Sequence, residues 1–237
     1  MALAFADMAV VRRKDDHLVS GPAMASTAQL GALRSRRRWR RIMGLLAIGL
    51  VLFLGAHAFV TLRGPRAAVI ARIGEWPYKG VMGLVALVGL ILIGYGFGQY
   101  RSSDWIDVWY PPRWTIYVTQ FLMWPASICV VAAYLRGDIW RKLKHPMLVG
   151  VKTWAVAHLV SNGDLGSIVL FGSFLAWAIY DRITLKRRTD PGAPPIPVGG
   201  RRNDVIALIG GTILYLALGL VFHPLVVGVP VFGRPAY

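Results

Sequence analysis

Cysteine and acidic residues are scarce in this chain of 237 residues. It has 11 Asp and Glu against 27 Lys and Arg, and a single cysteine, Cys129. One cysteine excludes a disulfide framework and a cysteine-based metal site. The shortage of carboxylates argues against a di-iron centre, which needs several Glu residues. The chain also lacks a nucleotide-binding glycine loop, a catalytic triad and a nucleophile elbow.

Hydrophobic residues, in contrast, make up 56% of the chain and charged residues only 16%. A mean hydropathy of +0.52 indicates a polytopic membrane protein whose partner is the lipid bilayer. The net charge of +16 is carried by Lys and Arg between apolar runs, so positive-inside topology explains it better than nucleic-acid binding. We therefore expect no nucleic acid as a partner.

Six apolar runs predict an all-α membrane bundle of about six transmembrane helices. They lie at about 42–62, 80–98, 115–135, 147–160, 165–180 and 205–223. The fourth and fifth runs are short and share the turn 161–164, which predicts a tight antiparallel hairpin with Asn162 or Asp164 capping the fifth helix.

The composition also predicts three segments. Residues 1–41 form a disordered basic extension, residues 42–229 the transmembrane domain, and residues 230–237 a short tail. The loops after helices one, three and five carry 14 Lys and Arg against 3 on the opposite side, which places these loops in the cytoplasm. The nine basic residues of the extension favour the reverse orientation. A natural translation start at Met43 resolves this conflict, and N-terminal sequencing of the native protein tests it.

Two histidines within the apolar runs are candidate ligands, because ionisable groups at membrane depth are costly. His57 lies between small residues, and His158 follows Trp154 by one helical turn. Neutral imidazoles on facing helices suit axial ligation of haem iron, with Lys152 available for a propionate. Interhelical hydrogen bonding is the alternative role of each histidine. Helical rise places His57 about 8 Å and His158 about 16 Å from the cytoplasmic side, an offset that one iron would have to bridge.

Two further histidines precede proline, and both favour structural roles. His145 before Pro146 fits a helix N-cap at the membrane interface. His223 before Pro224 ends the sixth run on the opposite side.

Several short motifs give the chain a family resemblance. Residues 55–188 resemble the NnrU family of bacterial membrane proteins. The motifs that carry the resemblance are Gly55-Ala56-His57, Ile73-Gly74-Glu75-Trp76-Pro77-Tyr78, Trp109-Tyr110-Pro111-Pro112, His145-Pro146-Met147, Trp154-Ala155-Val156-Ala157-His158 and Asn162-Gly163-Asp164. This resemblance implies a multi-pass protein of the bacterial inner membrane, associated with nitrite and nitric oxide metabolism.

The chain is also distantly similar to plastid 15-cis-zeta-carotene isomerases, which are haem-dependent membrane enzymes. By that similarity, His57 and His158 match the haem-ligating histidines. Two classes of function follow. One is a protein that binds haem b through His57 and His158 and acts as a polyene isomerase or beside respiratory nitrogen-oxide reductases. The other is an assembly factor without a cofactor. The sequence leaves open whether the protein is an enzyme.

Overall fold

The structure is a computed structural model, and it describes residues 27–103, 106–187 and 199–232, without the side chains of 27–38 and 40. The chain divides into two units, Met1–Arg37 and Arg38–Tyr237. Only the helical backbone of 27–37 is described in the first unit. The second unit holds the membrane helices and every side-chain contact below.

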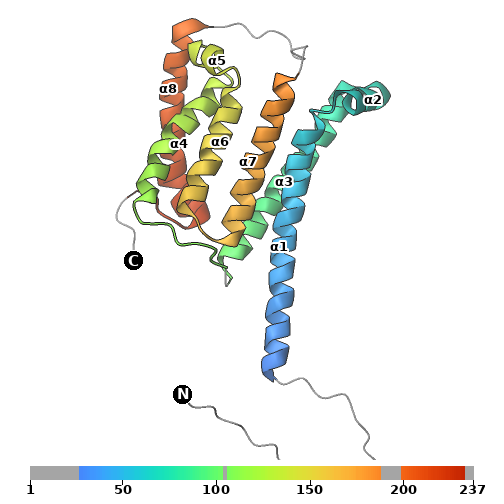
Figure 1. Cartoon of the computed structure of the whole chain (residues 1–237). Helices are drawn as coiled ribbons and strands as arrows, with labels where there is room; N and C mark the ends of the chain where they lie inside the picture. The colour runs from blue at the N-terminus through green and yellow to red at the C-terminus, as the bar shows by residue number, and fades with distance from the viewer. Residues whose placement is uncertain (1–26, 104–105, 188–198, 233–237) are drawn as a thin grey trace, which may run out of the picture. The chain divides into compact units, whose positions relative to one another are not determined.

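All regular secondary structure in the described ranges is helical, apart from one isolated bridge between Asp107 and Asp164. The helices, shown in Figure 1, are α1 (Thr27–Phe59), α2 (Arg63–Ile73), α3 (Glu75–Arg101), α4 (Thr115–Ala132), α5 (Asp138–Leu143), α6 (Pro146–Ser161), α7 (Leu165–Lys186), α8 (Gly200–Ala217) and the π-helix η1 (Leu218–Val227).

The predicted all-α membrane bundle is confirmed. Five helical stretches are long and apolar enough to cross a bilayer: Arg41–Phe59, α3, α4, α7, and α8 together with η1. The remaining predicted span, the fourth, is α6, whose 16 residues extend about 24 Å, less than the roughly 30 Å of a bilayer core. It packs against both α4 and α7, and six of its residues, His158 among them, are buried.

Three local features differ from the sequence-based expectations. Residues 27–41 are helical rather than disordered, since Arg, Ala and Leu favour helix and the adjoining membrane helix removes the cost of nucleation. Helix α7 extends to Lys186, so it is not short. The loops after α1 and α4 contain the short helices α2 and α5, which apolar periodicity did not indicate. Residues 1–26 and 233–237 of the predicted extension and tail lie outside the described residues.

Glycine allows α1 and α3 to approach until their backbones touch. A Cβ atom on Gly49 would lie 2.6 Å from the backbone nitrogen of Ile93, and one on Gly89 would lie 2.6 Å from that of Phe53. A Cβ atom on Gly96 would lie 2.7 Å from the backbone nitrogen of Leu46. Small residues permit such close packing in membranes, where lipid supplies no hydrophobic force between helices.

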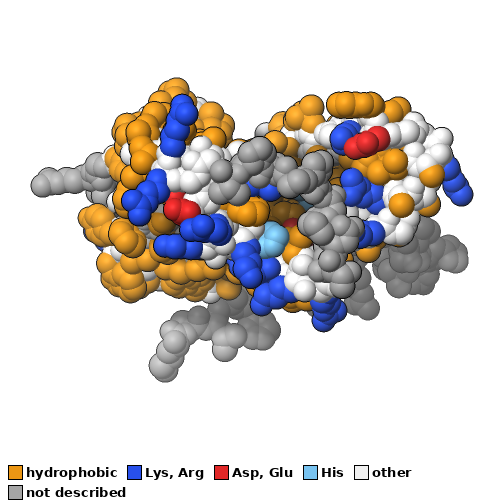
Figure 2. Space-filling view, turned by 90° about the horizontal axis from the view of Figure 1, so that it is seen from above, with side chains coloured by type: hydrophobic (Ala, Val, Ile, Leu, Met, Phe, Trp, Pro, Cys, Tyr) orange, Lys and Arg blue, Asp and Glu red, His pale blue; other side chains and the backbone are white. Residues whose placement is uncertain are grey.

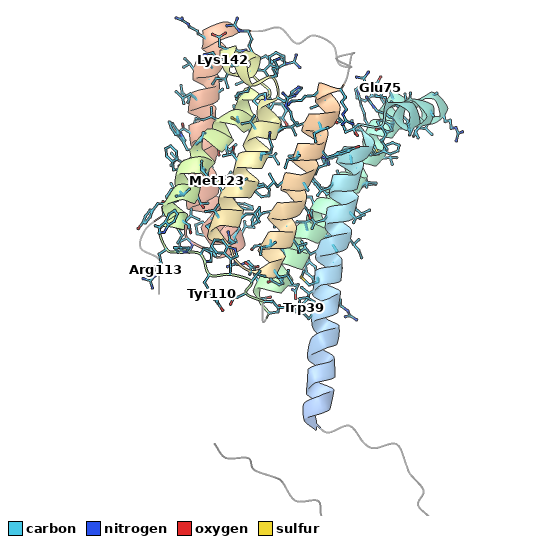
Figure 3. All side chains as sticks on the ribbon, in the orientation of Figure 1. Trp39, Glu75, Tyr110, Arg113, Met123 and Lys142 are labelled. Carbon is cyan, nitrogen blue, oxygen red and sulfur yellow. The ribbon has the colours of Figure 1, made fainter. Side chains whose placement is uncertain are left out.

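Basic side chains gather at one end of the bundle. Lys and Arg side chains gather over the end that carries α2, α5 and the start of α8 (Figure 2). Glu75 and Lys142 lie at this end, whereas Tyr110 and Arg113 lie at the opposite end (Figure 3). Glu75 and Lys79 form an ion pair of 2.8 Å on the first turn of α3. Because the basic loops share one end, the topology matches the predicted loop pattern.

Candidate functional site

His158 is buried in the bundle, with 9% of its surface accessible. It lies on α6, which begins at Pro146 after the predicted N-cap His145. Its Nδ1 donates a hydrogen bond of 2.9 Å to the carbonyl oxygen of Trp154. Because a carbonyl can only accept, this bond places the proton on Nδ1 and leaves the lone pair on Nε2, the form in which histidine binds a metal.

His57 has the same local geometry on α1. Its Nδ1 donates to the carbonyl oxygen of Phe53 at 2.7 Å, so its Nε2 also carries a lone pair. The Phe53 ring lies 4.3 Å from the His57 ring, and Trp177 of α7 meets it edge-on at 5.5 Å. Nothing lies within 4 Å of a Cβ built on Gly55, so the helix has open space at that position.

Aromatic rings fill the interval between His57 and His158. From Phe53 the contacts continue to Phe174 at 5.5 Å and from Phe174 to Trp154 at 5.2 Å. Trp154 then lies 5.5 Å from His158. We refer to Phe53, Phe171, Phe174, Trp154 and Trp177 as the aromatic array.

The two histidines also meet α7 at different heights. His158 stacks on Phe171 with ring centroids 4.6 Å apart, whereas His57 contacts Trp177. These partners are six residues apart, which corresponds to about 9 Å along the helix. The two rings therefore contact α7 about two turns apart.

The histidine that the structure places beside His158 is His223. Their ring centroids are 6.2 Å apart and their planes are inclined by 25°. His223 lies within η1, followed by Pro224, and its Nδ1 is buried without a hydrogen-bond partner among the described residues. Sequence reasoning assigned it only a structural role. The sequence did hold a signal for this pairing: the apolar runs 147–160 and 205–223 each have a histidine near the end that faces away from the cytoplasm.

Two more buried polar atoms adjoin the aromatic array without a hydrogen-bond partner among the described residues. They are Trp177 Nε1, beside His57, and Ser167 Oγ, one turn before Phe171. An unpaired polar group in an apolar interior costs roughly 1–3 kcal/mol. Such groups call for a bound partner such as water or a cofactor.

Lys152 does not join these residues. It lies on α6, six residues before His158, so the two side chains point about 120° apart around the helix. It is half-buried and makes no hydrogen bond or ion pair with a described residue. The contact of Lys152 with a haem propionate therefore stays a prediction.

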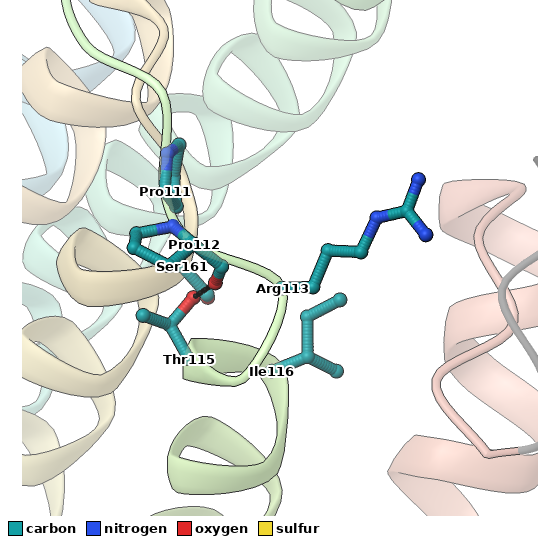
Figure 4. A pocket seen from close by; sticks show the side chains of 6 residues that line it. All are labelled: Pro111, Pro112, Arg113, Thr115, Ile116 and Ser161. Carbon is teal, nitrogen blue, oxygen red and sulfur yellow. Dashed lines mark hydrogen bonds between the residues drawn. The ribbon is translucent and has the colours of Figure 1, made fainter.

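A small cavity lies at the same end of the bundle as His158. Its volume is about 280 Å³, and Pro111, Pro112, Arg113, Thr115, Ile116 and Ser161 line it (Figure 4). Thr115 Oγ1 donates to the carbonyl oxygen of Pro112 at 2.7 Å, so this wall is hydrogen-bonded internally. The lining contains none of the histidines.

Comparison with known proteins now bears on these residues. The model of the NnrU protein family matches residues 45–231, which is most of the chain. The chain belongs to the NnrU family. No curated protein and no solved structure matches it. His57, His158, His223 and the aromatic array all fall inside the matched range, so the candidate site belongs to the NnrU domain itself.

Two of the motifs that resemble the NnrU family meet in space. The carbonyl oxygen of Gly163, in the α6–α7 turn, accepts hydrogen bonds from the N–H groups of Val108 at 2.8 Å and Trp109 at 3.1 Å. The N–H of Leu165 donates to the carbonyl of Ile106 at 2.8 Å. The α3–α4 loop thus covers the turn that follows His158.

Asn162 and Asp164 were both candidates for the cap of α7, and the structure places them on different helix ends. Asp164 caps α7, as predicted, because its Oδ1 accepts a hydrogen bond of 2.9 Å from the N–H of Ser167. Asn162 instead ends α6, where its Nδ2 donates to the carbonyl oxygen of His158 at 2.9 Å. The hairpin is therefore held by side chains at both of its helix ends.

Proposed function

We propose that this NnrU-family protein binds haem b within the membrane and uses His158 as an iron ligand. One observation carries the proposal: His158 is buried in an apolar bundle, and its Nδ1 is held by the Trp154 carbonyl, so Nε2 is left to bind a metal. When bound, haem supplies an iron centre for redox chemistry or for coordination of a substrate. The positive-inside pattern and the family favour the bacterial inner membrane as its location.

The fit of a haem to the residues is partial. Unpaired atoms at His223, Trp177 and Ser167 offer sites for a bound group. Of the ligand pair implied by resemblance, His57 contacts Trp177 and His158 contacts Phe171, six residues earlier on α7, and rings of the aromatic array lie between them. Within the described residues, no three His, Cys, Asp or Glu side chains cluster as a metal site.

The side chains around the candidate site define the surroundings that a bound haem would have. The aromatic array forms a water-excluding wall on the α7 side, and exposed hydrophobic side chains surround the bundle. An apolar, elongated molecule such as a polyene could approach from lipid, and nitric oxide also partitions into apolar surroundings. These two substrate classes correspond to isomerisation and to nitrogen-oxide metabolism.

A reduced-minus-oxidised absorption spectrum tests the proposal. The full chain is purified in detergent from haem-replete cells, together with His158→Ala and, as a matched control on the same helix, Val156→Ala, whose side chain is 40% exposed. We expect haem b bands in the wild type and the control, with loss in His158→Ala. A colourless wild type overturns the proposal.

The alternative is an assembly factor for respiratory nitrogen-oxide reductases, without a cofactor. The dense ring packing around His57 favours it, because Phe53 and Trp177 contact this ring as they would in a purely structural core. Affinity purification separates the classes: an assembly factor is colourless and co-purifies with a reductase subunit from denitrifying cells.

A further inference from the structure

We infer that His158 and His223 form a two-imidazole site for one transition-metal centre, either haem iron or a bare ion. The haem form of the inference rests on the proposed function, whereas the bare-ion form does not. Neither the family match nor the sequence reasoning assigns a role in binding to His223. The inference comes from the juxtaposition of a buried ring on α6 and a half-buried ring on η1.

The separation of the rings fits this role. An imidazole nitrogen binds a metal at about 2.0–2.1 Å, which puts the ring centroid roughly 3 Å from the metal. Two imidazoles on opposite sides of one metal therefore have centroids roughly 6 Å apart, and the separation here is 6.2 Å. A metal lies in the plane of each ring that ligates it, and the two rings are stacked with planes inclined by 25°. Because the bond to Trp154 holds the His158 ring, binding requires the His223 ring to turn about its own side-chain bonds.

Each ring has a nitrogen available. The hydrogen bond to Trp154 occupies Nδ1 of His158 and leaves its Nε2, whereas Nδ1 of His223 is buried and unpaired among the described residues. An unsatisfied imidazole nitrogen beside a second, correctly protonated imidazole is a costly arrangement in an apolar bundle. A metal bound between them removes that cost.

The backbone fixes where His223 stands. At the end of η1, the carbonyl oxygen of His223 accepts two hydrogen bonds. One comes from the N–H of Val229, at 3.2 Å, and the other from the N–H of Gly228. Gly228 has a positive φ of 75°, which this turn requires. Pro224 has no N–H to donate, and π-helical turns are frequent at functional sites. These bonds fix the backbone at His223, whose ring lies 6.2 Å from that of His158.

Two imidazole ligands limit which metal ions the site can bind. Imidazole suits iron, copper, zinc and nickel, whereas magnesium and calcium prefer oxygen ligands. Copper ranks highest in affinity among the divalent ions of the first row. Cys129 is the only cysteine in the sequence and lies buried on α4, and it takes no part in the pair.

The first experiment uses the full chain in detergent, with His57→Ala, His158→Ala, His223→Ala and the neighbouring control Phe222→Ala. Bound haem is measured by its reduced bands, and bound metal by elemental analysis after incubation with Cu²⁺ or Zn²⁺ and gel filtration. We expect the wild type, His57→Ala and Phe222→Ala to retain one centre per chain. Retention falls by more than about tenfold in His158→Ala and His223→Ala.

The outcomes separate the inference from the proposed function. Haem that persists in His223→Ala but is lost in His57→Ala overturns the inference and leaves haem binding intact. Copper or zinc held by His158 and His223 without haem supports the inference and overturns the proposed function. A wild type that retains neither haem nor either ion overturns both.

A second measurement guards against misfolding of the His223 variant. In His223→Gly, added imidazole is expected to restore the lost haem bands or bound copper, which a merely structural role would not do. Should both His223 variants fail to fold, the nitrogen hyperfine structure in the spin resonance spectrum of copper-loaded protein decides. Two coordinated imidazoles in His57→Ala support the inference, and one overturns it.

Discussion

The N–H of Trp109 donates a hydrogen bond of 3.1 Å to the carbonyl oxygen of Gly163, which ties the α3–α4 loop to the turn after His158. A side chain at Gly163 would collide with the carbonyl of Trp109 and approach Pro111. The fold therefore needs a residue without Cβ at this point. The contact fixes the end of α6 on which the candidate metal ligand stands.

Replacing Gly163 by Ala is expected to destabilise the protein. The added methyl group forces the loop away from the turn, at a cost of about 1–3 kcal/mol. Thermal unfolding in detergent, followed by circular dichroism, measures the loss. Gly172→Ala on α7 is the matched control, because nothing lies within 4 Å of a Cβ there. We expect this control to leave stability unchanged or raise it by up to about 1 kcal/mol. Equal effects of the two substitutions would show that the loop does not constrain the turn.

The cap of α7 gives a second prediction. Asp164→Ala removes the acceptor for the Ser167 N–H and should lower stability by about 1 kcal/mol. Asp164→Asn keeps an acceptor oxygen and should lie within a few tenths of a kcal/mol of the wild type. Chemical unfolding in mixed micelles compares the two variants. If Asp164→Asn loses as much stability as Asp164→Ala, the charge of Asp164 matters rather than its capping hydrogen bond.

The contact between α1 and α3 gives a third prediction. Gly89→Ala places a methyl group against the backbone of Phe53, whose ring contacts His57. We expect a loss of about 1–3 kcal/mol in stability, measured by thermal unfolding. Gly83→Ala on the same helix meets no atom within 4 Å and serves as the control. If Gly83→Ala is as harmful as Gly89→Ala, the loss does not arise from the contact with α1.

Membrane orientation can be tested with single cysteines. In a Cys129→Ala background, Tyr110→Cys and Lys142→Cys report the two ends of the bundle. The positive-inside rule predicts that a membrane-impermeant thiol reagent labels Tyr110→Cys in spheroplasts and labels Lys142→Cys only after lysis. Tyr110 is 81% exposed, so access does not limit its reaction. The reverse labelling pattern would place the basic loops outside.

Much of the fold followed from local sequence. Apolar runs locate the spans because a bilayer demands about 20 apolar residues in helical form. Pro146 marks the start of α6 and Asp164 that of α7, since both signals act within one helical turn. The same local reasoning missed α2, which contains no buried residue and so lacks a clear apolar face.

The sequence by itself determined a membrane bundle, its spans, its basic loops and the presence of histidines at membrane depth. Each of these depends on composition or on residues within a few positions of one another. Only the tertiary structure decided which side chains meet. It separated His57 from His158 by an aromatic array and placed His223, 65 residues away in the chain, beside His158. That choice depends on how α6, α7 and η1 pack, and helix packing in lipid is set by the shapes of facing surfaces, which hydropathy does not encode.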